Sequence, residues 1–409
     1  MAKETRLAVG VDLGGSSVTA VAVERREAQP VVVALGQAAL EPPQEHVGQR
    51  EAIVGVVRKV IEDAAIQASS ELREVFVSLP GEKIKGFNSE GMVEIPKQKI
   101  REVRPEHVRR VSEAAQAVSL PQDRRVVHAI SREYLLDGRS RITDPIGMSG
   151  SCLEARYHLI TAPAEVLDET LDIFRQAGLQ VVGMMAPGIA AAHAVLTEDE
   201  KKLGVAHLDI GSRLTSLVVY LEGGLTHTAS LAVGGADFTA DLADAAATVP
   251  EEAERLKLRS GELPSEEIDP TDVVTLPAVD GRPPQVIHRA FISGVLESRL
   301  DDILTFLMNE LNSQNLGGKL TAGIVLTGGT ALLRGIDVYI GNMLDAPVRI
   351  GVPHQVLGLD LVMNPRYATA AGLALVGLTG RENFYSGIGK SSGIGAVWQK
   401  TVDFFAELF

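Results

Sequence analysis

Two hairpin motifs, about half a chain apart, constrain this sequence more than any other feature. Each consists of an apolar strand that carries an aspartate near its end, a short turn, and a second strand of small and branched residues. The first spans Ala8–Glu24 and carries Asp12, and the second spans Gly204–Tyr220 and carries Asp209. Because the same order of residue types occurs twice, we expect two similar halves that each present one aspartate from a strand end.

A third segment, Gly323–Gly335, also joins a strand to a glycine turn. Its apolar residues up to Leu326 predict a buried strand, Thr327–Thr330 predicts a turn, and Ala331–Ile336 predicts the start of a helix. Such a turn lets backbone N–H groups approach an anion or a base, since glycine has no Cβ. One glycine turn is weak support for a nucleotide site, but three in one chain strengthen it.

The turns of the three segments carry small and polar residues: Gly14, Gly15, Ser16 and Ser17; Gly211, Ser212 and Arg213; Gly328, Gly329 and Thr330. This constellation resembles the two phosphate loops and the adenosine loop of the actin, Hsp70 and sugar-kinase superfamily. The resemblance implies an α/β, two-lobed actin-like ATPase fold, with a duplicated mixed sheet plus helices and ATP between the lobes. It also implies that Asp12 and Asp209 hold Mg²⁺, usually through water, because Mg²⁺ dehydrates reluctantly. The alternative is that each aspartate only hydrogen-bonds to the backbone of its own turn.

The second phosphate loop departs from the superfamily's more common Asp-x-Gly-Gly-Gly-Thr. Ser212 and Arg213 stand where two glycines are usual, and Leu214 stands where threonine is usual. Residues other than glycine resist a positive φ, so we expect them to crowd a bound phosphate. The sequence leaves two interpretations of Arg213 equal: its side chain supplies positive charge to phosphate, or it points to solvent.

A second group of candidate ligand residues follows Gly234–Gly235, where a new subdomain is expected to begin. Glu254 and Lys257 lie three residues apart on a predicted helix, Glu251–Arg259, and therefore share one face. With Gly235, they resemble the contacts to ribose and base in this superfamily. The alternative is a surface ion pair that contributes roughly a few tenths of a kcal/mol.

The bulk composition narrows the class of protein. A chain of 409 residues with 45% hydrophobic residues is too large for one core and predicts several subdomains. Its net charge of −14 argues against binding nucleic acid. Cys152 is the single cysteine, which excludes a disulfide framework and indicates a reducing compartment. The polar start Met1–Arg6 predicts that there is no signal peptide. The sequence contains no apolar run of about 18 residues, so we expect no transmembrane helix.

Two further segments differ in their predicted secondary structure: one contains turn residues and the other predicts a long helix. Lys83–Val93 is interrupted by the turn residues Gly86, Asn88 and Gly91. Val286–Leu316 predicts one long helix with a buried leucine and isoleucine stripe.

Motifs in the right order narrow the resemblance to one family, the bacterial cell-division actin homologue FtsA. They are Val75-Phe-Val-Ser-Leu-Pro-Gly, Gly91-Met-Val, Val126-Val-His-Ala-Ile-Ser-Arg-Glu-Tyr and Asp144-Pro-Ile-Gly-Met-Ser-Gly. The similarity extends from Val9 to Leu378. It implies that a small α+β domain, called 1C, is inserted into the actin-like fold in place of the actin subdomain at the other corner.

The resemblance implies the following division of the chain: lobe I (1A) at 1–81, 161–198 and 360–379; domain 1C at 82–160; lobe II (2A) at 199–235 and 318–359; subdomain 2B at 236–317; a linker at 380–393; and a C-terminal amphipathic helix at 394–409. The C-terminal peptide of FtsZ would bind to subdomain 2B (236–317), and we expect helix Glu297–Leu307 to form the contact. Other division proteins would bind through 82–160.

The junction between strand Val181–Met185 and helix Pro187–Leu196 bears on hydrolysis. Hydrolysing relatives place a glutamine or glutamate near this junction to orient the attacking water. Here the junction reads Met184-Met185-Ala186-Pro187 and offers neither an acid nor an amide. We therefore expect ATP binding with slow or absent hydrolysis, and the sequence leaves open whether the chain is an enzyme.

The last residues form an amphipathic pattern behind the glycine- and serine-rich linker Gly380–Gly393. At about 100° per residue, the apolar side of the predicted helix carries Val397, Trp398, Val402, Phe405, Leu408 and Phe409. FtsA ends in such a helix, which lies in the membrane surface. The polar side carries one lysine against Asp403 and Glu407, so electrostatic attraction to anionic lipid is missing. The alternative is a helix that docks on a protein surface.

The resemblance implies an ATP-binding actin-like protein that polymerises with itself and anchors FtsZ during cell division. It would act as a peripheral protein on the cytoplasmic face of the inner cell membrane, at the division site, with ATP and Mg²⁺ as cofactors. One alternative is a sugar kinase, because Val11-Asp-Leu-Gly-Gly-Ser-Ser also resembles a kinase phosphate loop. The other is a pilus-assembly actin homologue of the PilM type.

Overall fold

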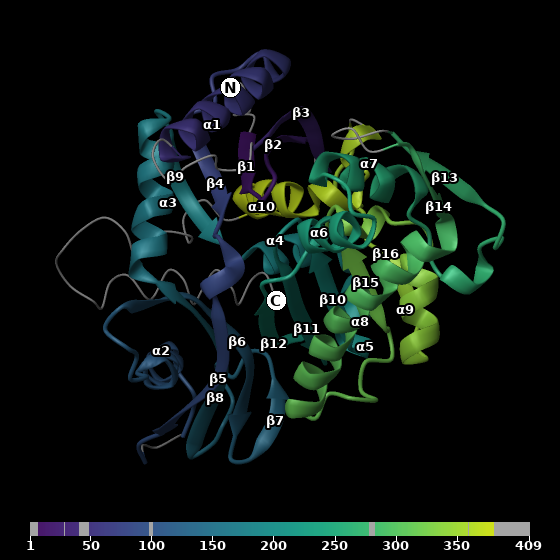
Figure 1. Ribbon diagram of the computed structural model, residues 1–409. Helices are drawn as coiled ribbons and strands as arrows, with labels where there is room; N and C mark the ends of the chain where they lie inside the picture. The colour runs from purple at the N-terminus through teal and green to yellow at the C-terminus, as the bar shows by residue number, and fades with distance from the viewer. Residues whose placement is uncertain are drawn as a thin grey trace.

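The computed structural model describes residues 7–27, 29–40, 49–97, 101–277, 283–358 and 360–379 (Figure 1). The predicted linker 380–393 and the predicted membrane segment 394–409, with its apolar residues from Val397 to Phe409, lie outside the described residues. None of the helices within the described ranges is both long enough and apolar enough to cross a membrane.

The first large sheet has the spatial order β3-β2-β1-β4-β9. Its strands are β1 (Leu7–Leu13), β2 (Ser17–Arg26), β3 (Gln29–Ala39), β4 (Glu74–Ser78) and β9 (Gln180–Met185). The pairs β1–β2 and β2–β3 are antiparallel, while β1–β4 and β4–β9 are parallel. Helices α1 (Gln49–Ala68) and α3 (Ala164–Gln176) contribute with it to one apolar cluster.

The second large sheet has the order β12-β11-β10-β15-β16 and repeats the first strand for strand. Its strands are β10 (Val205–Ile210), β11 (Thr215–Leu221), β12 (Gly224–Leu231), β15 (Ile324–Thr327) and β16 (Val348–Ile350). The directions also agree, with β10–β11 and β11–β12 antiparallel and β10–β15 and β15–β16 parallel. The predicted duplication is therefore confirmed, and each hairpin aspartate lies in the central strand of its sheet.

Several helices pack on the face of the second sheet that points away from the first sheet. They are α6 (Gly235–Ala245), α7 (Pro250–Ser260), α8 (Arg289–Ser313) and α9 (Ile336–Leu344), and α5 (Glu198–Leu203) packs against β11. The helix expected at Ala331–Ile336 begins later. Thr330–Leu332 forms a single 3₁₀ turn, and α9 starts only at Ile336 after Gly335, whose φ is 72°.

Two helices, α4 (Pro187–Val195) and α10 (Ala368–Thr379), lie between the large sheets and share one core with both (Figure 1). They cross in direct contact. A Cβ on Gly372 would collide with the backbone carbonyl of Ala190, so glycine is needed where the helix axes approach. Small residues in these helices allow one thin layer to serve both lobes.

The inserted sheet has the order β5-β8-β6-β7 and carries α2 (Pro105–Gln116) on one face. Its strands are β5 (Lys85–Glu94), β6 (Arg124–Leu136), β7 (Arg139–Ile142) and β8 (Cys152–Pro163). The turn residues noted in Lys83–Val93 thus lie within a strand. A Cβ on Gly91 would meet the backbone of Val111 and Ala115, so this glycine lets α2 pack closely.

The inserted sheet also touches lobe II. The His158 ring of β8 hydrogen-bonds to Asn88 Oδ1 through Nδ1 and to Thr228 Oγ1 of β12 through Nε2, each at 2.8 Å. Gly86 of β5 lies so close to Thr228 that it has no room for a Cβ. The insert is therefore packed against β12 by a buried polar contact that joins the two halves.

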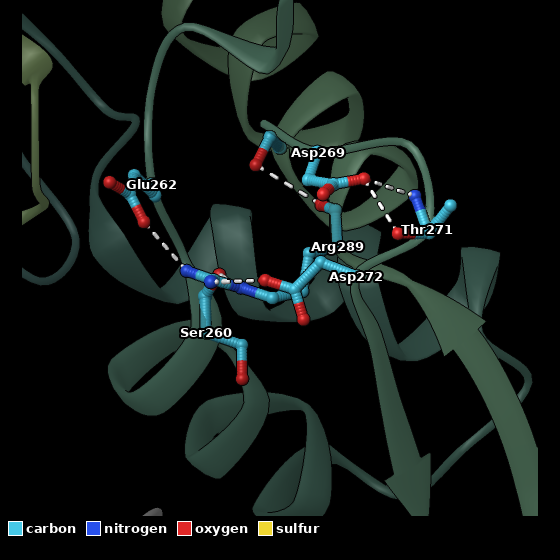
Figure 2. Close-up of polar contacts among 7 residues, drawn as sticks. Ser260, Glu262, Asp269, Thr271, Asp272 and Arg289 are labelled. Atoms are coloured by element: carbon cyan, nitrogen blue, oxygen red, sulfur yellow. Dashed lines mark hydrogen bonds and ion pairs between the residues drawn. The ribbon is translucent and has the colours of Figure 1, made fainter. Parts of the chain in front are cut away.

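A small hairpin, β13 (Val273–Leu276) with β14 (Gln285–His288), precedes α8. The long helix predicted from Val286 therefore begins only at Arg289. Residues Gln285–His288 pair with β13 instead. Figure 2 shows the contacts at the start of α8: the Arg289 guanidinium binds Glu262 at 2.6 Å and Asp272 at 2.7 Å, which ties the preceding loop to the first turn of the helix.

Candidate functional site between the duplicated sheets

The first phosphate-loop candidate is the turn between β1 and β2. The Gly14 N–H donates to the Ser17 carbonyl at 3.0 Å, which closes the turn. Gly15 and Ser16 are exposed at its tip. Asp12 makes a side-chain hydrogen bond with Ser78, and Ser78 Oγ also accepts from the Leu13 N–H at 2.9 Å. Sequence analysis missed Ser78, because only the β1–β4 pairing brings it beside Asp12.

The second phosphate-loop candidate is the turn between β10 and β11. The Gly211 N–H donates to the Leu214 carbonyl at 2.8 Å. The first turn of α6 holds the loop from behind, with Gly235 N–H donating to Gly211 O at 2.9 Å and Ala236 N–H to Ser212 O at 2.7 Å. Neither Ser212 nor Arg213 has a positive φ. The backbone strain expected from these residues is therefore absent, although their side chains remain.

Arg213 reaches toward the opposite loop. A Cβ built on Gly15 would lie 3.1 Å from Arg213 Cγ and 3.3 Å from Cδ, so the aliphatic stem passes over the first turn. The side chain is exposed. The two turns thus lie close to each other, with the aliphatic part of Arg213 against the tip of the first.

The carboxylates of Asp12 and Asp209 are close enough to repel each other. Burial raises the pKa of Asp209 to about 6, the hydrogen bond from Thr327 opposes this shift, and the charge of Asp12 adds to it. Burial also raises the pKa of Asp12, against its hydrogen bond with Ser78. Two partly buried carboxylates without a cation repel each other and lose hydration.

These carboxylates suit a divalent cation that brings other ligands with it. Among the described residues, no group of three or more His, Cys, Asp or Glu side chains is arranged to hold a metal ion. Asp12 and Asp209 would therefore be the protein's contribution, and water or phosphate oxygens would complete the coordination sphere. That division of ligands is typical of Mg²⁺ bound with a nucleotide.

The adenosine-side candidates also lie together. Lys257 Nζ contacts the Gly235 carbonyl, Thr239 Oγ1 and Glu254 Oε2, each at 2.7 Å. Thr330 Oγ1 donates to Gly211 O at 3.3 Å, which connects the β15–α9 loop to the second phosphate loop.

The glycines of the predicted adenosine loop differ in their surroundings. Gly328 has a φ of 88° and lies against Ile210 and Asp209. A Cβ on Gly329 would meet no atom within 4 Å, so its backbone borders open space that a ligand could occupy. Thr239, which also bonds to Glu254, is a residue that sequence analysis missed.

The junction between β9 and α4 contains no acid or amide, as its sequence indicated. The Ala186 N–H donates to His128 Nε2 at 3.3 Å, and burial lowers the pKa of His128 to about 3, which keeps the ring a neutral acceptor. Beside it is a cavity of about 20 Å³, enough for one water. Its polar side chains are the hydroxyls of Ser216, Thr228 and Ser230.

Comparisons with known proteins agree with this architecture. The family model described as cell division protein FtsA matches residues 206–372, and the model described as the SHS2 domain inserted in FtsA matches residues 81–161. The cell division protein FtsA of Pseudomonas aeruginosa is 35% identical over 376 residues, covering 91% of this chain and 89% of that protein. FtsA of Escherichia coli is 32% identical over 382 residues, covering 91% and 90%.

Solved structures with much lower identity share the fold. The PilM–PilN type IV pilus biogenesis complex aligns with a TM-score of 0.63 at 19% identity, covering 91% of this chain and 98% of the solved chain. MreB5 of Spiroplasma citri bound to ADP aligns with a TM-score of 0.56 at 14% identity, covering 94% and 100%. Together with the identity to the curated relatives, these matches show that the chain has an actin-like α/β fold with an inserted SHS2 domain and belongs to the FtsA family of cell-division proteins.

Proposed function

We propose that this chain binds ATP with Mg²⁺ between its two lobes. The observation that carries the proposal is the placement of Asp12 and Asp209 at equivalent positions of two matching sheets, each beside a turn. A cation between them would offset the loss of hydration, which is the main cause of the raised pKa of Asp209, and the smaller repulsion from Asp12. Related folds have been solved with nucleotide: one MreB5 structure is bound to ADP and another to AMPPNP.

The proposed contacts follow the geometry of the loops. Backbone N–H groups and hydroxyls of the two turns would hold the phosphates: Gly14, Gly15, Ser16, Ser17, Gly211 and Ser212. The Arg213 guanidinium would add positive charge, because its stem already lies over Gly15. Gly235, Glu254, Lys257 and Gly328–Thr330 would form the adenosine side. The Glu254 side chain is 43% exposed and Lys257 only 13%, so Glu254 is the better placed to meet a ribose hydroxyl.

Hydrolysis should be slow or absent. Among the described residues, the only polar side chains that line the cavity beside Ala186 and Pro187 are hydroxyls, and these neither hold a negative charge nor take up a proton readily near neutral pH. A bound nucleotide would then act mainly as a structural ligand that holds the lobes together.

As a member of the FtsA family, the chain is further proposed to polymerise on the cytoplasmic face of the cell membrane and to tether FtsZ there during division. A solved structure of similar fold is the MamK double helical filament, with a TM-score of 0.53. The amphipathic segment 394–409 would attach the filament to lipid, and its sequence pattern supports this part.

For the FtsZ contact, the outer face of α8 is the candidate surface. Leu300, Ile303, Leu304 and Leu307 of this helix are buried, whereas Ser298, Asp302, Thr305 and Met308 are exposed along the opposite stripe. Glu297 is already engaged by Ser265, through its N–H at 2.5 Å and its hydroxyl at 2.7 Å. A peptide would therefore meet the exposed stripe rather than Glu297.

The test of nucleotide binding is titration calorimetry of the intact chain with ATP, in excess Mg²⁺ and in EDTA. We expect binding that Mg²⁺ strengthens, and we expect Asp12→Ala and Asp209→Ala to lose that strengthening. Asp168→Ala, an exposed aspartate on α3, is the matched control. Absence of ATP binding by the intact chain in Mg²⁺ would refute the proposal. Electron microscopy on lipid monolayers with ATP, with and without FtsZ, tests the filament and tethering parts.

A further inference from the structure

We propose that Thr327, oriented by His207, is a positioning residue for the Asp209 carboxylate, and that Ser78 has the same role for Asp12. This inference rests on the proposed binding of ATP with Mg²⁺, because the carboxylates are positioned for that ligand. It assigns a role to three buried polar residues that are not among the predicted contacts to phosphate or adenosine.

The sheet itself places the second-lobe residues in one row. His207 and Asp209 are two residues apart on β10, so their side chains leave the same face of the strand. Thr327 is the parallel partner of Asp209 on β15. All three side chains therefore lie on the face of the sheet that α4 and α10 cover.

The hydrogen bonds in this row have a fixed direction when Asp209 is ionised. Thr327 Oγ1 donates its only proton to Asp209 Oδ1 at 2.8 Å. The Thr327 oxygen must then accept at its 2.8 Å contact with His207 Nε2, so His207 carries its proton on Nε2. The imidazole thus fixes the orientation of the hydroxyl, and the hydroxyl fixes one oxygen of the carboxylate.

Burial makes this arrangement rigid. His207 and Thr327 are both 0% exposed, so water does not compete for their hydrogen bonds. Gly328 follows with a φ of 88°, and a Cβ there would lie 3.0 Å from Asp209 Oδ1. Thr327 can hold Oδ1 closely because the next residue has no side chain.

The first lobe repeats the arrangement with a different donor. Ser78 ends β4, the parallel neighbour of β1, just as Thr327 ends β15, the parallel neighbour of β10. Ser78 accepts from the Leu13 N–H at 2.9 Å and hydrogen-bonds to Asp12. In both lobes a strand-end hydroxyl receives one N–H and holds the aspartate. A random buried threonine would not be expected to have this counterpart.

The test compares ATP affinity in Mg²⁺ and in EDTA for the intact chain and for Thr327→Val, Thr327→Ser and Ser78→Ala. Loss of a hydrogen bond to a charged group should weaken binding in Mg²⁺ roughly tenfold for Thr327→Val and for Ser78→Ala. Binding in EDTA should change less than about twofold. Thr327→Ser keeps the hydroxyl and should restore the affinity. Thr170→Val removes another buried hydroxyl, one that bonds within α3, and should change neither value.

His207 is tested in the same assay with two variants. His207→Gln keeps a donor of similar reach and should retain most of the Mg²⁺-dependent affinity, whereas His207→Leu should lose part of it. Circular dichroism establishes that each variant is folded before titration.

The outcomes separate this inference from the proposed function. If the intact chain does not bind ATP in Mg²⁺, the proposed function fails. If the intact chain binds but Thr327→Val weakens ATP equally in Mg²⁺ and EDTA, the threonine supports the adenosine loop and the positioning role is overturned. An unchanged affinity in both conditions overturns it as well.

Discussion

Replacing Asp209 by asparagine should stabilise the nucleotide-free protein and weaken its response to ATP. The pKa of Asp209 is raised from 3.8 to about 6, mainly by burial. At about 1.4 kcal/mol per pH unit, the ionised carboxylate costs the folded state up to about 3 kcal/mol. Asparagine has no charge to desolvate, and its amide oxygen can still accept the hydrogen bond from Thr327.

The sign of the pH dependence follows from the raised pKa. Between about pH 4 and pH 6 the folded protein keeps this proton while the unfolded chain has lost it, so the contribution of Asp209 to the free energy of unfolding falls as pH rises. Above that window the full cost is present. The advantage of Asp209→Asn should therefore be near zero at about pH 4 and grow to about 1–3 kcal/mol at about pH 8.

Urea unfolding of both proteins at several pH values, with Mg²⁺ omitted, measures this difference. A parallel series with ATP and Mg²⁺ should shrink this advantage and reverse it where it is below about 2.7 kcal/mol, which is the stabilisation that a hundredfold excess over Kd adds to a protein that binds. If Asp209→Asn is less stable than the intact chain at about pH 8 without nucleotide, the electrostatic reasoning is wrong.

Three further predictions concern acid stability, turnover and lipid binding. Burial holds four histidines neutral, with pKa values of about 3 for His128, His158 and His207 and about 4 for His193. Each of these histidines should lower the free energy of unfolding by about 1.4 kcal/mol at about pH 5.5, because the unfolded chain takes up protons there. The urea concentration at the unfolding midpoint should therefore be lower at about pH 5.5 than at about pH 7, and an unchanged midpoint would contradict this. Phosphate release should be far below the roughly 1–100 s⁻¹ typical of kinases; sugar phosphorylation at such a rate in a coupled assay would favour the kinase alternative. Vesicle co-sedimentation should depend on polymerisation and on Trp398 and Phe405, with little dependence on salt; a chain cut at Gly380 that pellets as well as the intact one would rule out the tail as the anchor.

The sequence predicted the features that are encoded locally. Each hairpin, with its aspartate and turn, lies within one short segment, so its pattern can be recognised without knowing what packs against it. The duplicated sheets follow from these hairpins and from the apolar strands after them. The family resemblance then supplied the order of the lobes and the insert.

The features that the sequence did not reveal depend on distant partners. Ser78 and Thr327 acquire their place beside an aspartate only through parallel pairing with β1 and β10. Gly91 has the residue type of a turn, but the approach of α2 explains it within a strand. The helix beginning at Arg289 is shorter than its apolar pattern, because β13 pairs with the preceding residues. In each case a tertiary contact decides between local alternatives.

The contact of the insert with β12 has a mechanical consequence. His158 and Gly86 belong to a domain that grows out of lobe I, yet they press against Thr228 of lobe II. If the lobes separate to exchange the proposed nucleotide, either this contact breaks or the insert moves together with β12. In the first case the contact acts as a latch with its own free-energy barrier. In the second case, a small rotation of the insert displaces its outer edge farther than the residues near the rotation axis.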